Sequence, residues 1–202
     1  MRRAPARPRG FTLLELLIAL AVTALVVALL FSGYAMIGRA EDRNQQQIDR
    51  GENMLLVSGW LQRKLESLRP LAQVDESGVH TFFSGNAAGA LWLAPLPELG
   101  AGGGLSVLRV GPERHADGSV DLVVQALPYN GARMTLDWAA AVSAPLMTDV
   151  RSLQWSYQDG ASGQWRPEWP GTGDQYPVRV RIQLGDAQGD WPALVVALPG
   201  AR

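Results

Sequence analysis

The chain of 202 residues contains no cysteine, so no disulfide can hold its fold together. Small domains in oxidising compartments often depend on disulfides. A domain without them has to be stabilised by its hydrophobic core. Seven tryptophans supply large apolar surfaces for such a core. The length is that of one folded domain with an additional segment.

Histidine is also scarce, because His80 and His115 are the only two. A histidine-rich metal site or a catalytic relay would have to use one of them. We expect His80 at the surface or edge of a strand and His115 in a loop over residues 112–118. Neither H-E-x-x-H nor G-x-S-x-G occurs in the chain. The sequence therefore predicts no catalytic residue, no cofactor and no enzymatic activity.

Four carboxylates fall in predicted loops, at Asp159, Asp174, Asp186 and Asp190. They lack the regular D-x-D spacing of a dedicated calcium loop. Solvated loops are the simpler interpretation, with a loop calcium site as the open alternative, and we assign no metal ligand. The glycine run at 100–104 lacks the lysine and the serine or threonine of a phosphate-binding loop, so we expect a flexible loop there.

Basic residues are few outside the first ten positions, which hold four arginines and no acidic residue. Of the 18 basic residues, 14 remain without these four, against 19 acidic residues, which leaves a net charge of −5. A nucleic-acid-binding surface needs a concentration of positive charge. The sequence predicts no nucleic-acid partner.

The chain does have a long apolar stretch, from Phe11 to Phe31, interrupted only by Thr12, Glu15 and Thr23. About twenty such residues are enough for a helix to cross the hydrocarbon core of a bilayer. The arginines before the stretch predict a cytoplasmic amino terminus, with the rest of the chain across the membrane.

Three interpretations of this stretch compete. A conventional signal peptide has a shorter apolar region followed by a cut site with small residues, and the small residues at 32–35 keep that option open. A plain membrane anchor fits the length. It gives no reason for Glu15, because a carboxylate in a membrane segment is costly. The third interpretation depends on what stands around this glutamate.

Gly10 precedes the sequence Phe11-Thr12-Leu13-Leu14-Glu15, and the apolar helix follows. These residues, in this order, resemble the class III signal of type IV pilins and type II secretion pseudopilins. The resemblance implies that a prepilin peptidase cuts between Gly10 and Phe11 and methylates the new amino terminus of Phe11. It also implies that Glu15 pairs with the amino terminus of a neighbouring subunit in a filament, since a buried carboxylate needs a partner.

The helical pattern continues past the apolar stretch. No proline occurs between Phe11 and Arg69. Apolar residues recur at three- and four-residue spacing and mark one face of a helix; they are Met54, Val57, Leu61, Leu65 and Leu68. Pro70 ends the pattern. The sequence predicts one helix to about Arg69, roughly 85–90 Å long at 1.5 Å per residue.

Beyond Pro70 the periodicity becomes that of strands. We predict strands at 79–83, 90–93, 105–110, 120–127 and 133–138, bounded by turns such as Asp117-Gly118 and Asn130-Gly131. The alternation of apolar and polar residues from Val178 to Leu184 predicts a strand with one buried face.

The last third of the chain resembles J-type minor pseudopilins. A turn into a strand at 145–157 is followed by W-x-x-x-W-P at 165–170, the alternating strand at 177–184 and a closing apolar strand at 193–199. The sequence Leu61-Gln62-Arg63-Lys64-Leu65 is similar to the same subfamily, whereas residues 72–144 match it weakly. We expect Trp165 and Trp169 to be core aromatics that pin a long loop.

These resemblances imply an α+β, pilin-like fold, in which a long N-terminal helix packs on an antiparallel β-sheet domain. The expected parts are a leader at 1–10, a transmembrane helix at 11–35, its amphipathic continuation at 36–70 and a periplasmic β-rich domain at 71–202. The implied location is the bacterial inner membrane, crossed once, with the amino terminus cytoplasmic.

The implied function is that of a minor pseudopilin of a type II secretion system, which helps to initiate or cap the pseudopilus that exports folded proteins. The implied partners are I- and K-type minor pseudopilins, the major pseudopilin, the inner-membrane assembly platform and the prepilin peptidase. The alternatives are a minor pilin of a type IV pilus and a membrane-anchored periplasmic enzyme or carbohydrate-binding module. Exposed tryptophans would favour the binding module and buried ones a structural protein.

Overall fold

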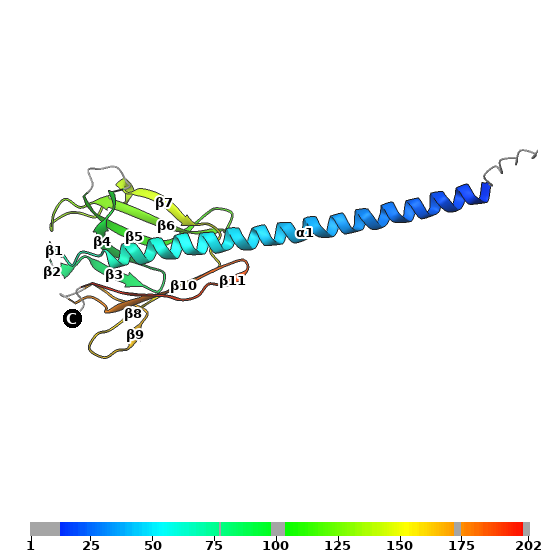
Figure 1. The fold of residues 1–202 in the computed structure, drawn as a ribbon. Helices are drawn as coiled ribbons and strands as arrows, with labels where there is room; N and C mark the ends of the chain where they lie inside the picture. The colour runs from blue at the N-terminus through cyan, green and yellow to red at the C-terminus, as the bar shows by residue number, and fades with distance from the viewer. Residues whose placement is uncertain (1–12, 77, 98–103, 172–174, 200–202) are drawn as a thin grey trace, which may run out of the picture. The chain divides into compact units, whose positions relative to one another are not determined.

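The computed structural model describes residues 13–76, 78–97, 104–171 and 175–199, except the side chains of residues 15, 19, 26, 28–46, 75 and 79. The chain divides into two units, Met1–Gly51 and Glu52–Arg202. The first unit contains the beginning of the helix α1 (Leu13–Glu66), and the second contains its end together with all the strands (Figure 1).

Helix α1 is continuous over 54 residues, as the absence of proline predicts. It ends three residues before the predicted boundary at Arg69. The amide of Leu68 bonds to the carbonyl of Leu65 in a tighter turn, and the amide of Arg69 donates to the carbonyl of Leu93, 2.8 Å away. A contact with a strand therefore replaces the last helical bond. Within the described residues, no helix has both the length and the hydropathy of a candidate membrane span.

The strands form a hairpin and two five-stranded antiparallel sheets. The hairpin consists of β1 (Ala72–Asp75) and β2 (Gly78–Thr81). The first sheet has the order β3-β4-β5-β6-β7, with bounds Phe83–Asn86, Gly89–Pro95, Leu105–Arg114, Val120–Pro128 and Val142–Met147. The second has β8 (Ser152–Gln158) between β9 (Trp165–Arg166) and β10 (Arg179–Asp186), and β10 also pairs with β11 (Gly189–Asp190) and β12 (Leu194–Ala197).

Several predicted strands appear close to their expected positions, although β5 runs four residues further, to Arg114, and two predictions fail. The predicted strand at 79–83 is divided between β2 and β3, because the amide of Phe82 bonds to the carbonyl of Leu71. The predicted strand at 133–138 is wrong. There the chain turns and enters a short 3-10 helix, η2 (Trp138–Ala140), which Asp137 caps by accepting from the amide of Ala139.

The main core lies where the end of α1 meets both sheets. The helix contributes the predicted apolar face, in which Val57, Leu61, Leu65 and Leu68 are buried and Met54 is partly buried. In Figure 1 the last turns of α1 run with β4 and β5 to one side and β8 and β10 to the other. The sheets contribute Trp92, Leu108, Val124, Trp155, Tyr157, Val180 and Ile182 to the same cluster. This arrangement confirms the α+β, pilin-like fold.

Candidate assembly surface

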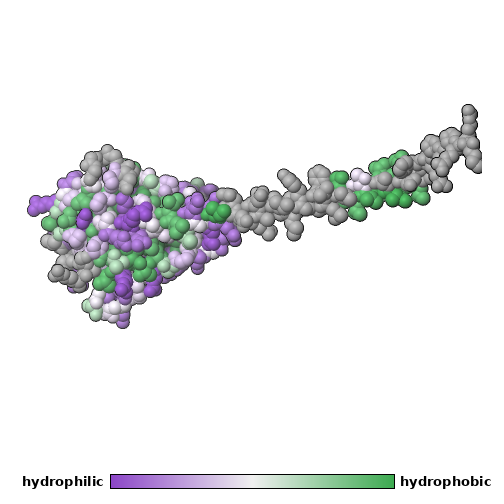
Figure 2. All heavy atoms as spheres, viewed as in Figure 1, coloured by the Kyte–Doolittle hydropathy of each residue, from purple (hydrophilic) through white to green (hydrophobic). Residues whose placement is uncertain are grey.

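The first unit has an exposed apolar surface. Its described side chains from Leu13 to Val27 include nine large apolar ones that are 45–82% exposed, and Figure 2 shows them in green along this part of the helix. A contiguous apolar patch of this kind marks an interaction surface, since water is an unfavourable surrounding for it. Lipid or other helices are the surroundings that suit it.

A shallow groove of about 420 Å³ follows one line of this surface. It is lined by Leu16, Leu20, Thr23, Ala24 and Val27. Four of these five residues are spaced by four, three and four positions, the repeat with which helices pack along a common seam. Thr23 and Ala24 are small, and small residues let a second helix approach closely. The groove therefore suits helix–helix packing.

The predicted processing site does not fall on this described surface. Gly10 and Phe11 lie outside the described residues. Glu15 lies in the first turn of α1, and its side chain is among those not described. The cut site and the charge pair therefore stay predictions.

In the second unit, α1 also exposes apolar side chains. Leu55 is 71% exposed and Leu56 is 67% exposed, although the neighbouring Val57 is buried in the core. A helix that only packed on its own domain would carry polar residues at the two exposed positions. Leu55 and Leu56 therefore form an apolar spot on the exposed side of α1, the side that faces away from the core.

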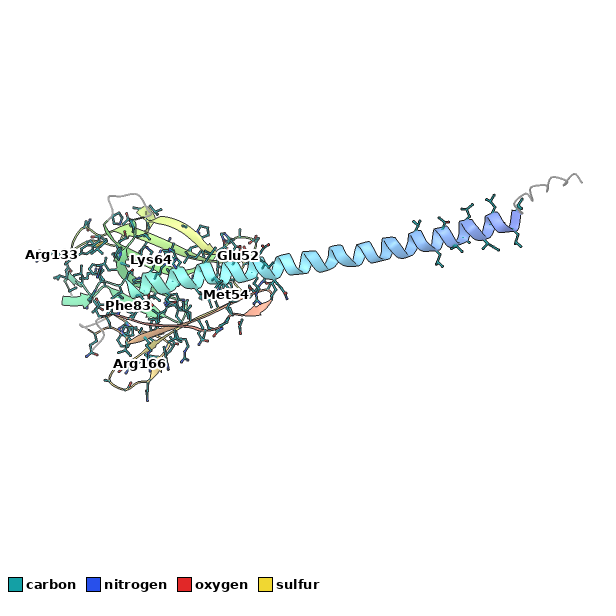
Figure 3. All side chains as sticks on the ribbon, in the orientation of Figure 1. Glu52, Met54, Lys64, Phe83, Arg133 and Arg166 are labelled. Carbon is teal, nitrogen blue, oxygen red and sulfur yellow. The ribbon has the colours of Figure 1, made fainter. Side chains whose placement is uncertain are left out.

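Two hydrogen bonds fix the end of α1 against β4. The Lys64 ammonium donates to the carbonyl of Pro95 over 3.1 Å, and the Trp92 indole donates to the carbonyl of Lys64 over 3.0 Å. Figure 3 labels Lys64 and Met54 on this part of the helix, with Lys64 nearer its end. The middle and the last residue of β4 therefore both hold this strand against the end of the helix.

The tryptophans lie mainly inside the domain. Trp92, Trp155, Trp169 and Trp191 are buried, and the other three are half-buried. Trp169 pins its loop as predicted, because its backbone bonds in both directions to Gly85 and its indole donates to the carbonyl of Gln175. The prediction for Trp165 as a core residue is wrong. Its ring is half-buried and has the Arg181 guanidinium 4.0 Å from its centre.

The polar side chains named from the sequence stabilise turns. The His115 ring lies 3.0 Å from the carboxylate of Asp121, and the pKa of Asp117 is lowered by hydrogen bonds from Ser119. His115 follows directly on β5, so the predicted loop at 112–118 begins three residues late. His80 is half-buried in β2, opposite Gln73.

The loop carboxylates each have their own partner. Asp159 accepts from the amides of its own turn, which lowers its pKa, and Asp186 accepts from the indole of Trp191. Asp190 accepts from the hydroxyl of Ser152 over 2.6 Å, and Asp174 lies outside the described residues. Among the side chains that the structure describes, no three potential ligands gather into a metal-binding group.

One surface was not predicted from the sequence. The face of the β3–β7 sheet that points away from α1 carries a groove of about 450 Å³, with Arg109, Gln125 and Trp138 along it. Arg109 and Gln125 are direct neighbours across β5 and β6. The Asp117-Gly118 turn could have revealed this pair, because residues equally far from a hairpin turn face one another.

Comparison with known proteins bears on both units. Residues 5–31 match the family model described as "Prokaryotic N-terminal methylation motif". The chain is 29% identical to "Type II secretion system protein J" of Xanthomonas campestris pv. campestris, over 96% of this chain and 95% of that protein. The chain is therefore similar to J-type minor pseudopilins of type II secretion systems along nearly its whole length.

A solved structure has a similar fold. One chain of the crystal structure of the GspK-GspI-GspJ complex, from the type 2 secretion system of enterotoxigenic Escherichia coli, matches with a TM-score of 0.52 and 17% identity. The match covers 75% of the present chain and 98% of the other. The matched methylation motif overlaps the exposed apolar surface at 13–27, so motif and surface belong to the same segment.

Proposed function

We propose that this chain is a J-type minor pseudopilin, which helps to initiate or cap the periplasmic pseudopilus of a type II secretion system, the filament that drives export of folded proteins across the outer membrane. The observation that carries the proposal is the similarity to a secretion protein J along 96% of the chain, which joins the methylation motif and the β domain in one protein. The role is structural, and its chemistry is that of subunit association.

The apolar surface at 13–27 supports the association step. After removal of residues 1–10, the helix is drawn from the inner membrane into a bundle with helices of other subunits. The seam from Leu16 to Val27 provides a surface for close packing. In this bundle the carboxylate of Glu15 pairs with the methylated amino terminus of Phe11 in a neighbouring subunit, so that neither charge is buried alone.

The second unit supports recognition of the partners. The exposed pair Leu55 and Leu56 offers apolar area beside the folded core, where another subunit can cover it. The solved structure with the matching fold is that of a GspK-GspI-GspJ complex. We infer that I- and K-type minor pseudopilins are partners of this chain, together with the major pseudopilin and the inner-membrane assembly platform.

The proposed location follows from the same scheme. The prepilin peptidase processes the chain at the cytoplasmic face of the inner membrane, and the β domain lies in the periplasm. The buried and half-buried tryptophans give no support to a carbohydrate-binding module, which presents aromatic rings to solvent. A type IV pilus is the remaining alternative, and gene neighbourhood separates it from a secretion system.

The experiment uses the source bacterium with this gene deleted. We expect exported proteins to accumulate, folded, in the periplasm and a tagged copy of the chain to restore export and to co-purify with I- and K-type subunits. The double variant Leu55→Asp, Leu56→Asp should lose the co-purification, whereas Gln62→Asp, on an exposed polar position of the same helix, should keep it. Normal export in the deletion strain, with loss of surface pili, would show the pilus alternative to be correct.

A further inference from the structure

The described residues cover part of the outer face of the β3–β7 sheet. The chain between β6 and β7 folds back over it and closes a second apolar cluster, in which Phe82, Leu93, Val107, Leu127 and Met134 are buried. Trp138 packs at the border of this cluster. Beyond Trp138 the same face opens into the groove of about 450 Å³, which ends at Trp169 and Pro170.

The floor of this groove lies close to the sheet backbone. Gly89 and Gly111 stand on adjacent strands, and Ala88 lies beside them. A side chain at Gly89 is excluded, because its Cβ would lie 2.1 Å from the carbonyl oxygen of Val110. A Cβ at Gly111 would meet nothing closer than the carbonyl of Ala88, 3.8 Å away. Gly89 is therefore required by the close approach of β5, whereas the space at Gly111 is open to a ligand.

Arg109 is the charged residue among those that line the groove, and its guanidinium is held in place. It lies 4.2 Å from the centre of the Trp138 ring, and its Nε and Nη2 both donate to Oε1 of Gln125. A guanidinium has five N–H donors, so Gln125 engages only part of the set. Burial lowers the pKa of Arg109, which means that its charge has lost part of its hydration.

These features together specify an anionic ligand with an extended backbone. A planar guanidinium fixed against a ring is suited to carboxylates, which accept two parallel hydrogen bonds. A single small anion would fill only a fraction of 450 Å³. Leu91 and Trp169 add apolar surface on either side of the floor.

We propose that this groove binds an extended peptide segment of another protein, with a glutamate or aspartate side chain of the segment held by Arg109. The segment would lie over Gly89 and Gly111, with apolar residues against Leu91 and Trp169. The surface is separate from the helix surfaces of the proposed function. If the groove binds no peptide, the proposed assembly through the helix can still be correct. If the proposed assembly is wrong, the groove can still bind a peptide.

The test uses the full chain in detergent micelles and two fluorescein-labelled peptides with blocked ends, Gly-Ser-Leu-Glu-Leu-Ser-Gly and its glutamine counterpart. Fluorescence anisotropy measures both affinities. We expect the glutamate peptide to bind about tenfold more tightly, with the difference falling as salt is added. Arg109→Gln should remove the difference. Arg114→Gln, at the exposed end of the same strand, is the matched control and should leave it unchanged.

A second variant separates binding from folding. Gly111→Asp has room for its side chain and places a carboxylate two residues along β5 from Arg109, on the same face. It should block the glutamate peptide while leaving the melting temperature within a few degrees. Equal affinity for the two peptides, or equal losses in Arg109→Gln and Arg114→Gln, would overturn the proposal, as would binding that Gly111→Asp leaves intact.

Discussion

The indole of Trp92 donates a hydrogen bond to the carbonyl oxygen of Lys64, 3.0 Å away. Trp92 stands in the middle of β4 and is fully buried, and Lys64 stands in the last turn of α1, where carbonyls lack helical partners. One side chain of the sheet therefore both fills the core and caps the helix. This bond links β4 of the sheet to α1, the helix whose earlier residues 13–27 form the exposed apolar surface.

Replacing Trp92 should cost more stability than the loss of buried apolar area alone, because the indole hydrogen bond is lost as well. We expect Trp92→Phe to lower the free energy of unfolding by about 2–4 kcal/mol, because a buried bond is lost and a cavity is left. Trp165→Phe, at a half-buried ring outside the core, should cost less than about 1 kcal/mol. Urea unfolding of both variants measures the difference, and equal costs would contradict a special role for Trp92.

The second prediction concerns Tyr157, because its side chain extends from β8 in the second sheet to the backbone of the first sheet. Its hydroxyl lies 2.8 Å from the carbonyl of Gly89 and 3.0 Å from that of Asn86. A Cβ at Gly85 would lie 2.1 Å from this hydroxyl. We expect Gly85→Ala to destabilise the domain by about 1–3 kcal/mol through overpacking. Gly111→Ala, where space is open, is the control, and thermal unfolding should show it close to the unmodified chain.

How much of this could be predicted from the sequence differs between the elements. The apolar face of α1 from Met54 to Leu68 was predicted, because a helix buries one face whatever it packs on. The strand β7 was missed because Pro145 lies inside it. Its place at the edge of the sheet tolerates a residue that cannot donate.

The division into two sheets was not predictable from local periodicity. Tyr157 and Trp92 lie on different sheets and share one core, and their strands read alike in sequence. Only part of the groove on the outer face of the β3–β7 sheet could be predicted from the sequence. The register of Arg109 with Gln125 follows from the turn between β5 and β6, but Trp138 reaches them only because an irregular segment folds back across the sheet.

Alkaline pH gives a third prediction. Burial raises the pKa of Tyr157 well above its ordinary value of 10.0 and that of Tyr176 to about 12. The folded chain then holds protons that the unfolded chain releases, so the contribution of these two tyrosines to stability is constant below about pH 10 and falls as the pH rises beyond it. Denaturant unfolding between pH 8 and 12 should show this fall. Tyr157→Phe should make the slope shallower, and an unchanged slope would contradict the assignment to Tyr157.

Processing of the amino terminus gives a fourth prediction. If the bond between Gly10 and Phe11 is cut, mass spectrometry of the mature protein should begin at N-methylated Phe11. Gly10→Val should block maturation, because a branched side chain replaces the glycine at the cut, whereas Ala4→Val in the same leader should be processed normally. A mature terminus within residues 33–36 would instead identify an ordinary signal peptide and defeat the pseudopilin interpretation of this segment.

The last prediction concerns Glu15 and separates assembly from anchoring. Removing the carboxylate eases membrane insertion, and processing should survive, since the expected cut lies on the other side of Phe11. Subunit association should fail, because a buried amino terminus would lose its partner at a cost of about 3–5 kcal/mol. Glu15→Ala should therefore give a processed, membrane-held chain that exports poorly and captures little I- or K-type subunit. Glu52→Ala, which removes an exposed carboxylate from the same helix, should do neither.

A subunit at the very tip of a filament has no neighbour above it. Unchanged export and capture in Glu15→Ala would therefore mean that this chain makes no such pair, and that Glu15 is a tolerated charge at the end of the helix.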